Sequence, residues 1–191
     1  MISRDSLLSL EAYARERGTF RARVMEHKKR RTVHLGGHIT LLFEDELTIR
    51  YQVQEMLRIE RIFEEDGIQH ELDAYNPLVP DGSNWKATML IEYPEPEERK
   101  RMLGKLKGIE RHAWVQVQGA ERVGAIADED LERENEEKTS SVHFLRFELT
   151  RDMCQRLRAG AGISVGVDHP EYRASTELAP EVRSALAADI A

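Results

Sequence analysis

The stretch from Thr40 to Tyr93 constrains the fold most strongly, because a strand, an amphipathic helix, a polar loop and a second strand follow one another there. The helix carries ionisable residues at positions where a helix that only packs in a core would carry hydrocarbon side chains. The loop, residues 73–85, has more hydrogen-bonding side chains than a turn requires. We therefore look for a functional site in this stretch first.

The helix of this stretch is expected to run from 45 to 65. Asp45 is a suitable N-cap, and Gly67 lies just beyond the end. Apolar residues also alternate with polar ones between 47 and 53, which is typical of a strand, so the first half of the segment has two interpretations. A short helix over 68–74 is expected to follow.

The other segments predict an α+β fold. Helices are expected over 6–16, 19–31, 96–107 and 150–159, and strands over 86–93, 113–118, 122–127, 142–149 and 162–167. Gly36-Gly37 predicts a two-residue hairpin turn that pairs Leu35 with His38 and His34 with Ile39. Because strands and helices do not alternate strictly, we expect a mainly antiparallel sheet of about five to seven strands with helices packed on it.

A chain of 191 residues suits one domain. We expect a single α+β domain over 1–172, in which residues 1–31 form a helical N-terminal part. The tail, 173–191, is alanine-rich and is expected to be weakly helical or disordered.

Composition excludes several classes of function. A net charge of −7 argues against a nucleic-acid binder, although basic residues gather between 15 and 31 as on a solvated helix face. No apolar run suits a membrane span, and the first residues lack the apolar core of a secretory signal. Cys154 is the only cysteine, which excludes an intrachain disulfide and an all-cysteine metal site. These features predict a cytoplasmic protein.

The acidic run from 128 to 138 is typical of a solvated helix or loop. A docking surface for a basic partner is the alternative.

Glu60 is the most unusual side chain of the helix, because it falls near the middle of the apolar arc that runs from 49 to 63. A buried, ionised carboxylate costs several kcal/mol unless it is paired. The simpler interpretation is an ion pair with Arg146. The functional interpretation is a metal ligand or a proton-transfer carboxylate, with Glu55 and Arg58 on the same helix completing a binding face.

Metal binding would need residues from several segments, since no Glu-x-x-His motif lies on the 45–65 helix. Glu60, His27 and His143 are the candidate ligands, for iron or another transition metal. His143 shares a strand face with apolar residues, where a hydrogen-bonded core histidine is the simpler interpretation.

The loop also has two interpretations. It is either a well-packed Ω-type loop whose polar groups satisfy its own backbone, or a binding lip over the helix. In the second case the binding residues would be Asp81, Asn84, Trp85 and Lys86.

Several longer strings carry a resemblance: residues 27–33, 52–62, 74–78, 80–88 and 143–147. Over roughly His27 to Tyr172 the chain resembles the bacterial domain-of-unknown-function family 3501. The resemblance implies a setting beside rubrerythrin-like proteins and iron–sulfur oxidoreductases of the heterodisulfide-reductase type. It implies no functional residue.

The function expected from these observations is an accessory protein of an iron-dependent redox or oxidative-stress system that binds a partner protein and could hold a metal. The alternatives are a small-molecule enzyme with a buried carboxylate and a histidine, and a structural or regulatory interaction module. Neither a nucleic acid nor a membrane is the expected partner.

Overall fold

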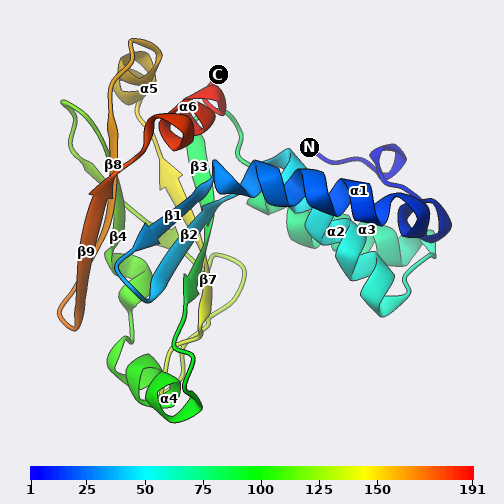
Figure 1. Ribbon diagram of the computed structural model, residues 1–191, viewed down its shortest axis with the longest axis horizontal. Helices are drawn as coiled ribbons and strands as arrows, with labels where there is room; N and C mark the ends of the chain where they lie inside the picture. The colour runs from blue at the N-terminus through cyan, green and yellow to red at the C-terminus, as the bar shows by residue number, and fades with distance from the viewer. The chain divides into compact units, whose positions relative to one another are not determined.

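The computed structural model describes residues 1–191, which divide into two compact units (Figure 1). The first unit consists of Met1–Arg30 and Glu44–Pro80, and the second of Arg31–Phe43 and Asp81–Ala191. The buried apolar residues gather in two separate clusters, one in each unit. A single domain over 1–172 stays a prediction from the sequence.

The first unit is helical. Its elements are α1 (Leu10–Lys29), α2 (Glu46–Glu60) and α3 (Glu65–Tyr75), with short 3-10 turns at Arg4–Ser6 and Asn76–Leu78. The core of this unit contains Ile2, Leu7, Ile49, Val53, Leu57, Ile68 and Leu72. The two helices expected over 6–16 and 19–31 form one helix, α1. Gly18 lies within it, is exposed, and does not break it.

A capping box fixes the start of α2 and excludes the strand interpretation. The Asp45 carboxylate accepts from the Thr48 amide at 3.0 Å, and the Thr48 hydroxyl accepts from the Asp45 amide at 3.0 Å. The helix ends at Glu60 because Arg61 adopts the left-handed conformation, with φ of 54°. The N-cap was therefore predicted correctly and the end at 65 wrongly.

The second unit contains two antiparallel sheets, which confirms the α+β class. Nine strands are present, more than the five to seven expected. The larger sheet has the order β1-β2-β3-β7-β6 and the smaller β5-β4-β8-β9. The strands are β1 (Thr32–Leu35), β2 (Ile39–Phe43), β3 (Asn84–Ile91), β4 (Ala113–Val117), β5 (Arg122–Gly124), β6 (Ile126–Ala127), β7 (Val142–Glu148), β8 (Ile163–His169) and β9 (Tyr172–Glu177).

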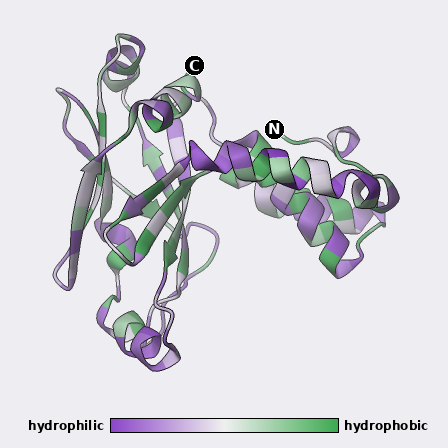
Figure 2. Ribbon diagram, in the orientation of Figure 1, coloured by the Kyte–Doolittle hydropathy of each residue, from purple (hydrophilic) through white to green (hydrophobic).

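Alternating burial along β3 and β7 shows that each strand turns one face to the core. The residues of β2 are mostly hydrophobic, whereas α4 (Pro96–Lys105) is largely hydrophilic (Figure 2). The chain passes from the smaller sheet to the larger one at Ala125, between β5 and β6. This crossing brings residue 128 beside β7, where Asp128 N–H donates to the Phe144 carbonyl at 2.8 Å.

The β1–β2 hairpin has a three-residue turn rather than the two-residue turn expected. Leu35 pairs with Ile39 and His34 with Thr40. Gly36 has a φ of 66°, and a Cβ there would lie 2.5 Å from the Tyr172 hydroxyl oxygen. Glycine is therefore needed at this position for both conformation and space.

The C-terminal segment, which was expected to be weakly helical or disordered, contains one strand and one helix, β9 and α6 (Pro180–Ala188). The indole of Trp85 donates to the Leu186 carbonyl at 2.9 Å, and the buried guanidinium of Arg31 donates to the Phe43 carbonyl at 2.8 Å and pairs with Asp189. These contacts hold α6 on the sheet. No helix in the chain combines the length and apolarity needed to cross a bilayer.

Candidate functional site

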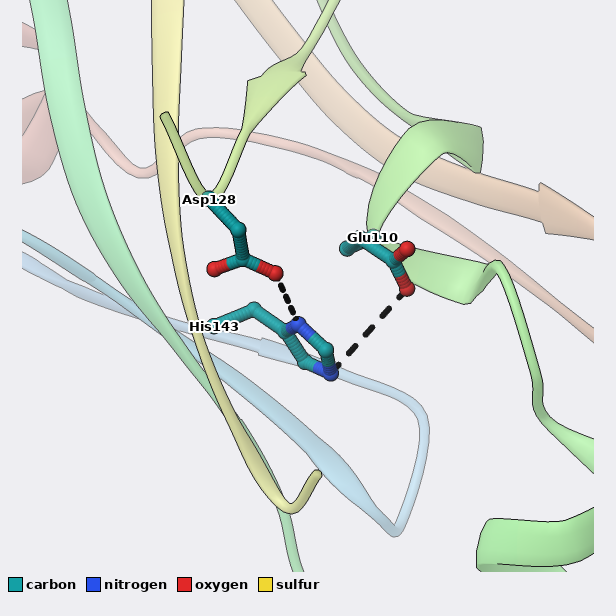
Figure 3. A group of neighbouring side chains, drawn as sticks. All are labelled: Glu110, Asp128 and His143. Atoms are coloured by element: carbon teal, nitrogen blue, oxygen red, sulfur yellow. Dashed lines mark hydrogen bonds and ion pairs between the residues drawn. The ribbon is translucent and has the colours of Figure 1, made fainter. Parts of the chain in front are cut away.

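Three ionisable side chains meet in the second unit: Glu110, Asp128 and His143 (Figure 3). His143 lies on β7 and points to its buried face. Asp128 directly follows β6, and Glu110 lies in the 3-10 turn Ile109–His112 that precedes β4. One ligand atom from each residue lies within 4.8 Å of the others. The strand crossing at Ala125 therefore brings together residues from three separate segments.

Asp128 orients the imidazole of His143. Its Oδ2 lies 2.5 Å from Nδ1 of His143, and since a carboxylate only accepts, Nδ1 carries a proton and donates. The other oxygen, Oδ1, accepts from the amide of Phe144 at 3.0 Å and from Nη1 of Arg133 at 3.2 Å. Asp128 has a φ of 50°, a conformation that costs a non-glycine residue roughly 1–3 kcal/mol. This local strain accompanies the placement of the carboxylate against the ring.

The second ring nitrogen, Nε2, has three polar neighbours. The Thr139 hydroxyl lies 2.9 Å away, the Ser140 carbonyl 3.0 Å away, and Oε2 of Glu110 4.0 Å away. Nε2 holds either a proton, which it donates to the Ser140 carbonyl, or a lone pair, which accepts from the Thr139 hydroxyl. A cation between Nε2 and Glu110 would use that lone pair.

Glu110 is 3 % exposed, and its Oε2 is buried without a hydrogen-bond partner. The other oxygen, Oε1, lies 3.4 Å from Nε of Arg111, whose side chain is largely exposed. A buried carboxylate oxygen that accepts no hydrogen bond is costly, because water no longer solvates it. Glu110 therefore has an unmet electrostatic requirement on the side that faces His143.

An acidic hollow of about 340 Å³ borders the group. Six carboxylates line it against two guanidinium groups: Glu110, Asp128, Glu129, Asp130, Glu132 and Glu134, with Arg111 and Arg133. Arg133 donates to both oxygens of Asp130, at 2.6 and 2.8 Å, and this lowers the pKa of Asp130 despite partial burial. The surplus of negative charge favours cations at the entrance to the site.

The arrangement supports two kinds of chemistry. Thr139, His143 and Asp128 lie in the order of a hydroxyl–imidazole–carboxylate relay, but Thr139 is 1 % exposed, so its hydroxyl is closed to a substrate. The alternative is metal ligation by Nε2 and Glu110, with Asp128 as the carboxylate that holds the liganding imidazole. This second arrangement gives the buried Oε2 of Glu110 a partner.

Of the three metal candidates from the sequence, only His143 belongs to this group. Glu60 is exposed at the end of α2, which contradicts the expectation of a buried carboxylate. Because α2 ends at residue 60, the apolar arc that would have enclosed this side chain stops there, and Phe63 is 71 % exposed. His27 contacts the helix-capping carboxylate of Asp45, with 2.5 Å between Nε2 and Oδ2.

The binding residues proposed on the helix form ion pairs within the first unit. Glu55 accepts from Arg17 at 2.7 Å, from Arg58 at 2.9 Å and from the buried Tyr13 hydroxyl at 3.1 Å. Burial alone would raise the pKa of Glu55, but these hydrogen bonds lower it below its usual value. The cluster joins α1 to α2 and has a structural explanation.

Arg146 does not pair with Glu60, as the simpler interpretation expected. Its guanidinium binds both oxygens of Glu129, at 2.7 and 2.8 Å, and also pairs with Glu148. The hydrogen bonds that the guanidinium donates to Glu129, and then to Glu148, raise its pKa.

The loop residues proposed as a binding lip are used within the protein. Asp81 accepts from the amide and the hydroxyl of Ser83, at 3.0 and 2.9 Å, and the backbone contact lowers the pKa of Asp81. Asn84 and Trp85 are each 1 % exposed, and Asn84 donates to Glu148 at 2.9 Å. Lys86 is half-buried and opposite Arg146 in the sheet. This geometry favours the packed-loop interpretation.

Glu110 and Asp128 were not among the site residues predicted from the sequence. Asp128 was included in an acidic run that usually indicates a solvated segment, and Glu110 stood next to an arginine in a polar turn. The available signal was the position of Asp128 directly after a predicted strand, since strand ends often carry functional side chains. Nothing in the local sequence of Glu110 distinguishes it.

Comparison with known proteins identifies the family of the chain. A family model described as "Protein of unknown function (DUF3501)" matches residues 1–190. A crystal structure titled as a novel protein of unknown function from Burkholderia pseudomallei K96243 is 57 % identical, with a TM-score of 0.95, and the alignment covers 100 % of this chain and 99 % of that one. No curated protein matches. Since the family model spans nearly all residues, the chain belongs to the DUF3501 family.

Proposed function

We propose that this protein binds a divalent transition metal through Nε2 of His143 and Oε2 of Glu110, and acts as an accessory protein rather than as an enzyme. The observation that carries the proposal is the buried Oε2 of Glu110, which lacks a hydrogen-bond partner and lies 4.0 Å from Nε2. Metal–nitrogen and metal–oxygen bonds of about 2.1 Å let two donors of one cation lie at most about 4.2 Å apart. The 4.0 Å between these atoms is within that limit, at a wide nitrogen–metal–oxygen angle.

The surroundings support this use. Asp128 fixes the ring through Nδ1, as carboxylates commonly do for metal-bound histidines. The acidic hollow beside Glu110 leaves room for water or another ligand on the metal. Imidazole and carboxylate donors suit Zn²⁺, Fe²⁺ or Mn²⁺, whereas Cu⁺ prefers sulfur ligands, and Cys154 is buried in α5 (Arg151–Arg158).

The redox setting is a further part of the proposal. Resemblance to the family implies rubrerythrin-like and iron–sulfur proteins as companions, and iron would then be the metal of interest. A partner protein and a cytoplasmic location likewise stay predictions.

Equilibrium dialysis tests the metal site. Protein purified without a histidine tag is dialysed against Zn²⁺, Mn²⁺ or anaerobic Fe²⁺, and the bound metal is measured by mass spectrometry. We expect about one equivalent of at least one metal, with binding lost in Glu110→Gln and kept in Glu60→Gln. No metal in the wild type, or unchanged metal in Glu110→Gln, would refute the proposal.

Thermal melts in chelator then check that Glu110→Gln keeps the fold. The variant should melt at or above the wild-type temperature, because the amide removes a buried charge that lacks a partner. With metal added, only the wild type should gain stability. A large destabilisation of Glu110→Gln in chelator would instead indicate a structural role for the carboxylate.

A further inference from the structure

A second hollow, of about 360 Å³, lies on the smaller sheet of the second unit and has no part in the metal site. Residues of β4, β5, β8 and β9 line it: Trp114, Arg122, Val167, Asp168, Arg173, Ala174 and Ser175. Polar and charged groups predominate among these side chains. The hollow therefore differs from the apolar interior between the two sheets.

Glycine residues on the neighbouring strands leave space for the indole of Trp114. Gly124 and Gly166 stand opposite Trp114 on the two neighbouring strands. A Cβ at Gly166 would lie 2.4 Å from the ring, so any side chain there would displace it. The ring is 8 % exposed, and its Nε1 is a buried donor without a hydrogen-bond partner. A donor in this state needs an acceptor atom.

Positive charge exceeds negative charge around this donor. The guanidinium of Arg122 stacks on the indole, 3.8 Å from its centroid. Arg122 and Arg173 both approach Asp168, with nitrogen–oxygen distances of 3.9 and 3.3 Å. Two guanidinium groups thus share one carboxylate. The side chain of Arg122 is 53 % exposed and that of Arg173 is 73 % exposed. Exposed ion pairs of this length are weak, so both arginines can turn toward another anion.

We propose that this hollow binds an oxyanion, the phosphate or carboxylate group of a ligand, between Arg122, Arg173 and the indole N–H of Trp114. The unpaired N–H selects an acceptor, and the paired guanidinium groups select negative charge and bind oxyanions through parallel N–H donors. To bind the anion, Arg122, whose guanidinium stacks on the face of the ring, turns toward the edge that carries Nε1. Asp168 competes with the ligand for both arginines and so limits affinity.

Because the chain has two tryptophans, one spectrum records both the test, Trp114, and its control, Trp85. The indole N–H peaks of Trp114 and Trp85 are followed by ¹H–¹⁵N NMR during titration with inorganic phosphate, and separately with acetate, at constant ionic strength set by sodium chloride. Trp114→Phe assigns the peaks. We expect a saturable shift of the Trp114 peak alone, because the N–H of Trp85 donates to the Leu186 carbonyl in the core.

The outcomes separate the ligand sources and the alternatives. A shift with phosphate only, acetate only or both identifies a phosphate group, a carboxylate or either as the bound group. The double variant Arg122→Ala, Arg173→Ala should lose the shift, while Arg158→Ala, an exposed arginine on α5, should keep it. Asp168→Asn should tighten binding severalfold. No saturable shift with either anion, or a shift that persists in the double variant, would overturn the proposal.

Discussion

The carboxylate of Asp128 and the imidazole of His143 form the closest polar contact of the candidate metal site, with 2.5 Å between Oδ2 and Nδ1. Asp128 is also one of only two non-glycine residues with positive φ, the other being Arg61. A strained backbone residue and a buried hydrogen bond thus coincide at one position. The hydrogen bonds of the carboxylate offset the cost of this backbone conformation.

Replacing Asp128 separates these two contributions. Asp128→Ala should lower the free energy of unfolding by about 3 kcal/mol, since it removes acceptors for His143, the Phe144 amide and Arg133 and leaves the strain. Asp128→Gly loses the same hydrogen bonds but tolerates φ of 50°, so it should be roughly 1 kcal/mol more stable than Asp128→Ala. Urea denaturation measures both values, and equal stabilities would show that strain contributes nothing.

Asp128→Asn addresses the orientation of His143. The amide has one acceptor oxygen, so it can serve either the ring or the Phe144 amide, and the protein should lose about 1–2 kcal/mol. If the metal binds at Nε2, the loss of the supporting carboxylate should weaken metal affinity about 10- to 100-fold. Dialysis with the metal found for the wild type measures this. Unchanged affinity would exclude a supporting role for Asp128.

Arg31 should be essential for the docking of α6. Its side chain is 2 % exposed and binds the Phe43 carbonyl and Asp189, which lie far apart in sequence. Arg31→Met keeps most of the aliphatic stem but removes the charge, and we expect a loss of about 3–5 kcal/mol because Asp189 loses its arginine.

Urea denaturation measures the loss, and limited proteolysis should cut the Arg31→Met variant near its C-terminus first. Arg158→Met is the matched control, because Arg158 is exposed. Similar stabilities of the two variants would contradict a specific role for Arg31.

Acid should destabilise the cluster around Glu55. Hydrogen bonds from Arg17, Arg58 and Tyr13 overcome the effect of burial and lower the pKa of Glu55 in the folded state, whereas an unfolded glutamate has a pKa of about 4.3. A group with a lowered folded pKa stabilises the protein above its unfolded pKa, and this contribution disappears as pH falls through the folded pKa. The contribution of Glu55 should therefore be complete above about pH 5 and decline below about pH 4.

The comparison with Glu55→Gln isolates this contribution. Other carboxylates with lowered pKa, such as Asp81 and Glu129, titrate in both proteins and cancel in the difference. The wild type should be more stable than Glu55→Gln at pH 6, and the gap should narrow toward pH 3 in chemical denaturation. A gap that stays constant with pH would show that the charge of Glu55 is unimportant.

Much of the fold could be predicted from local sequence. The cap at Asp45, the strand from 142 and the antiparallel α+β class follow from patterns within a few residues. The end of α2 could not be predicted, because Arg61 adopts a left-handed conformation that sequence usually reserves for glycine. Because the helix ends there, Glu60 is exposed to solvent and not buried in the core as expected.

The candidate site was harder to predict because its residues meet through topology. Asp128 reaches His143 because the chain crosses between the sheets at Ala125, and Glu110 comes from a turn before β4. No short-range pattern in the sequence encodes that arrangement. The helix and loop that suggested a site use their polar groups for internal ion pairs and turns. The residue types led us to expect a carboxylate beside a buried histidine, but the carboxylates that lie beside His143 are Glu110 and Asp128, not Glu60.

Gly166 should be required for the packing of the Trp114 indole against β8. Gly166→Ala would bring a methyl group to within 2.4 Å of the indole, on the strand directly opposite, and neither the ring nor the central strand β8 can move without losing contacts. Such overpacking costs about 1–3 kcal/mol.

Gly124→Ala is the control, because it lies opposite Trp114 on the other side and a Cβ there meets nothing within 4 Å. We expect Gly166→Ala to lose stability in urea denaturation and to shift the Trp114 indole N–H peak, while Gly124→Ala changes neither by much. If both variants behaved like the wild type, the indole would not lie against Gly166. It would then not line the hollow as described.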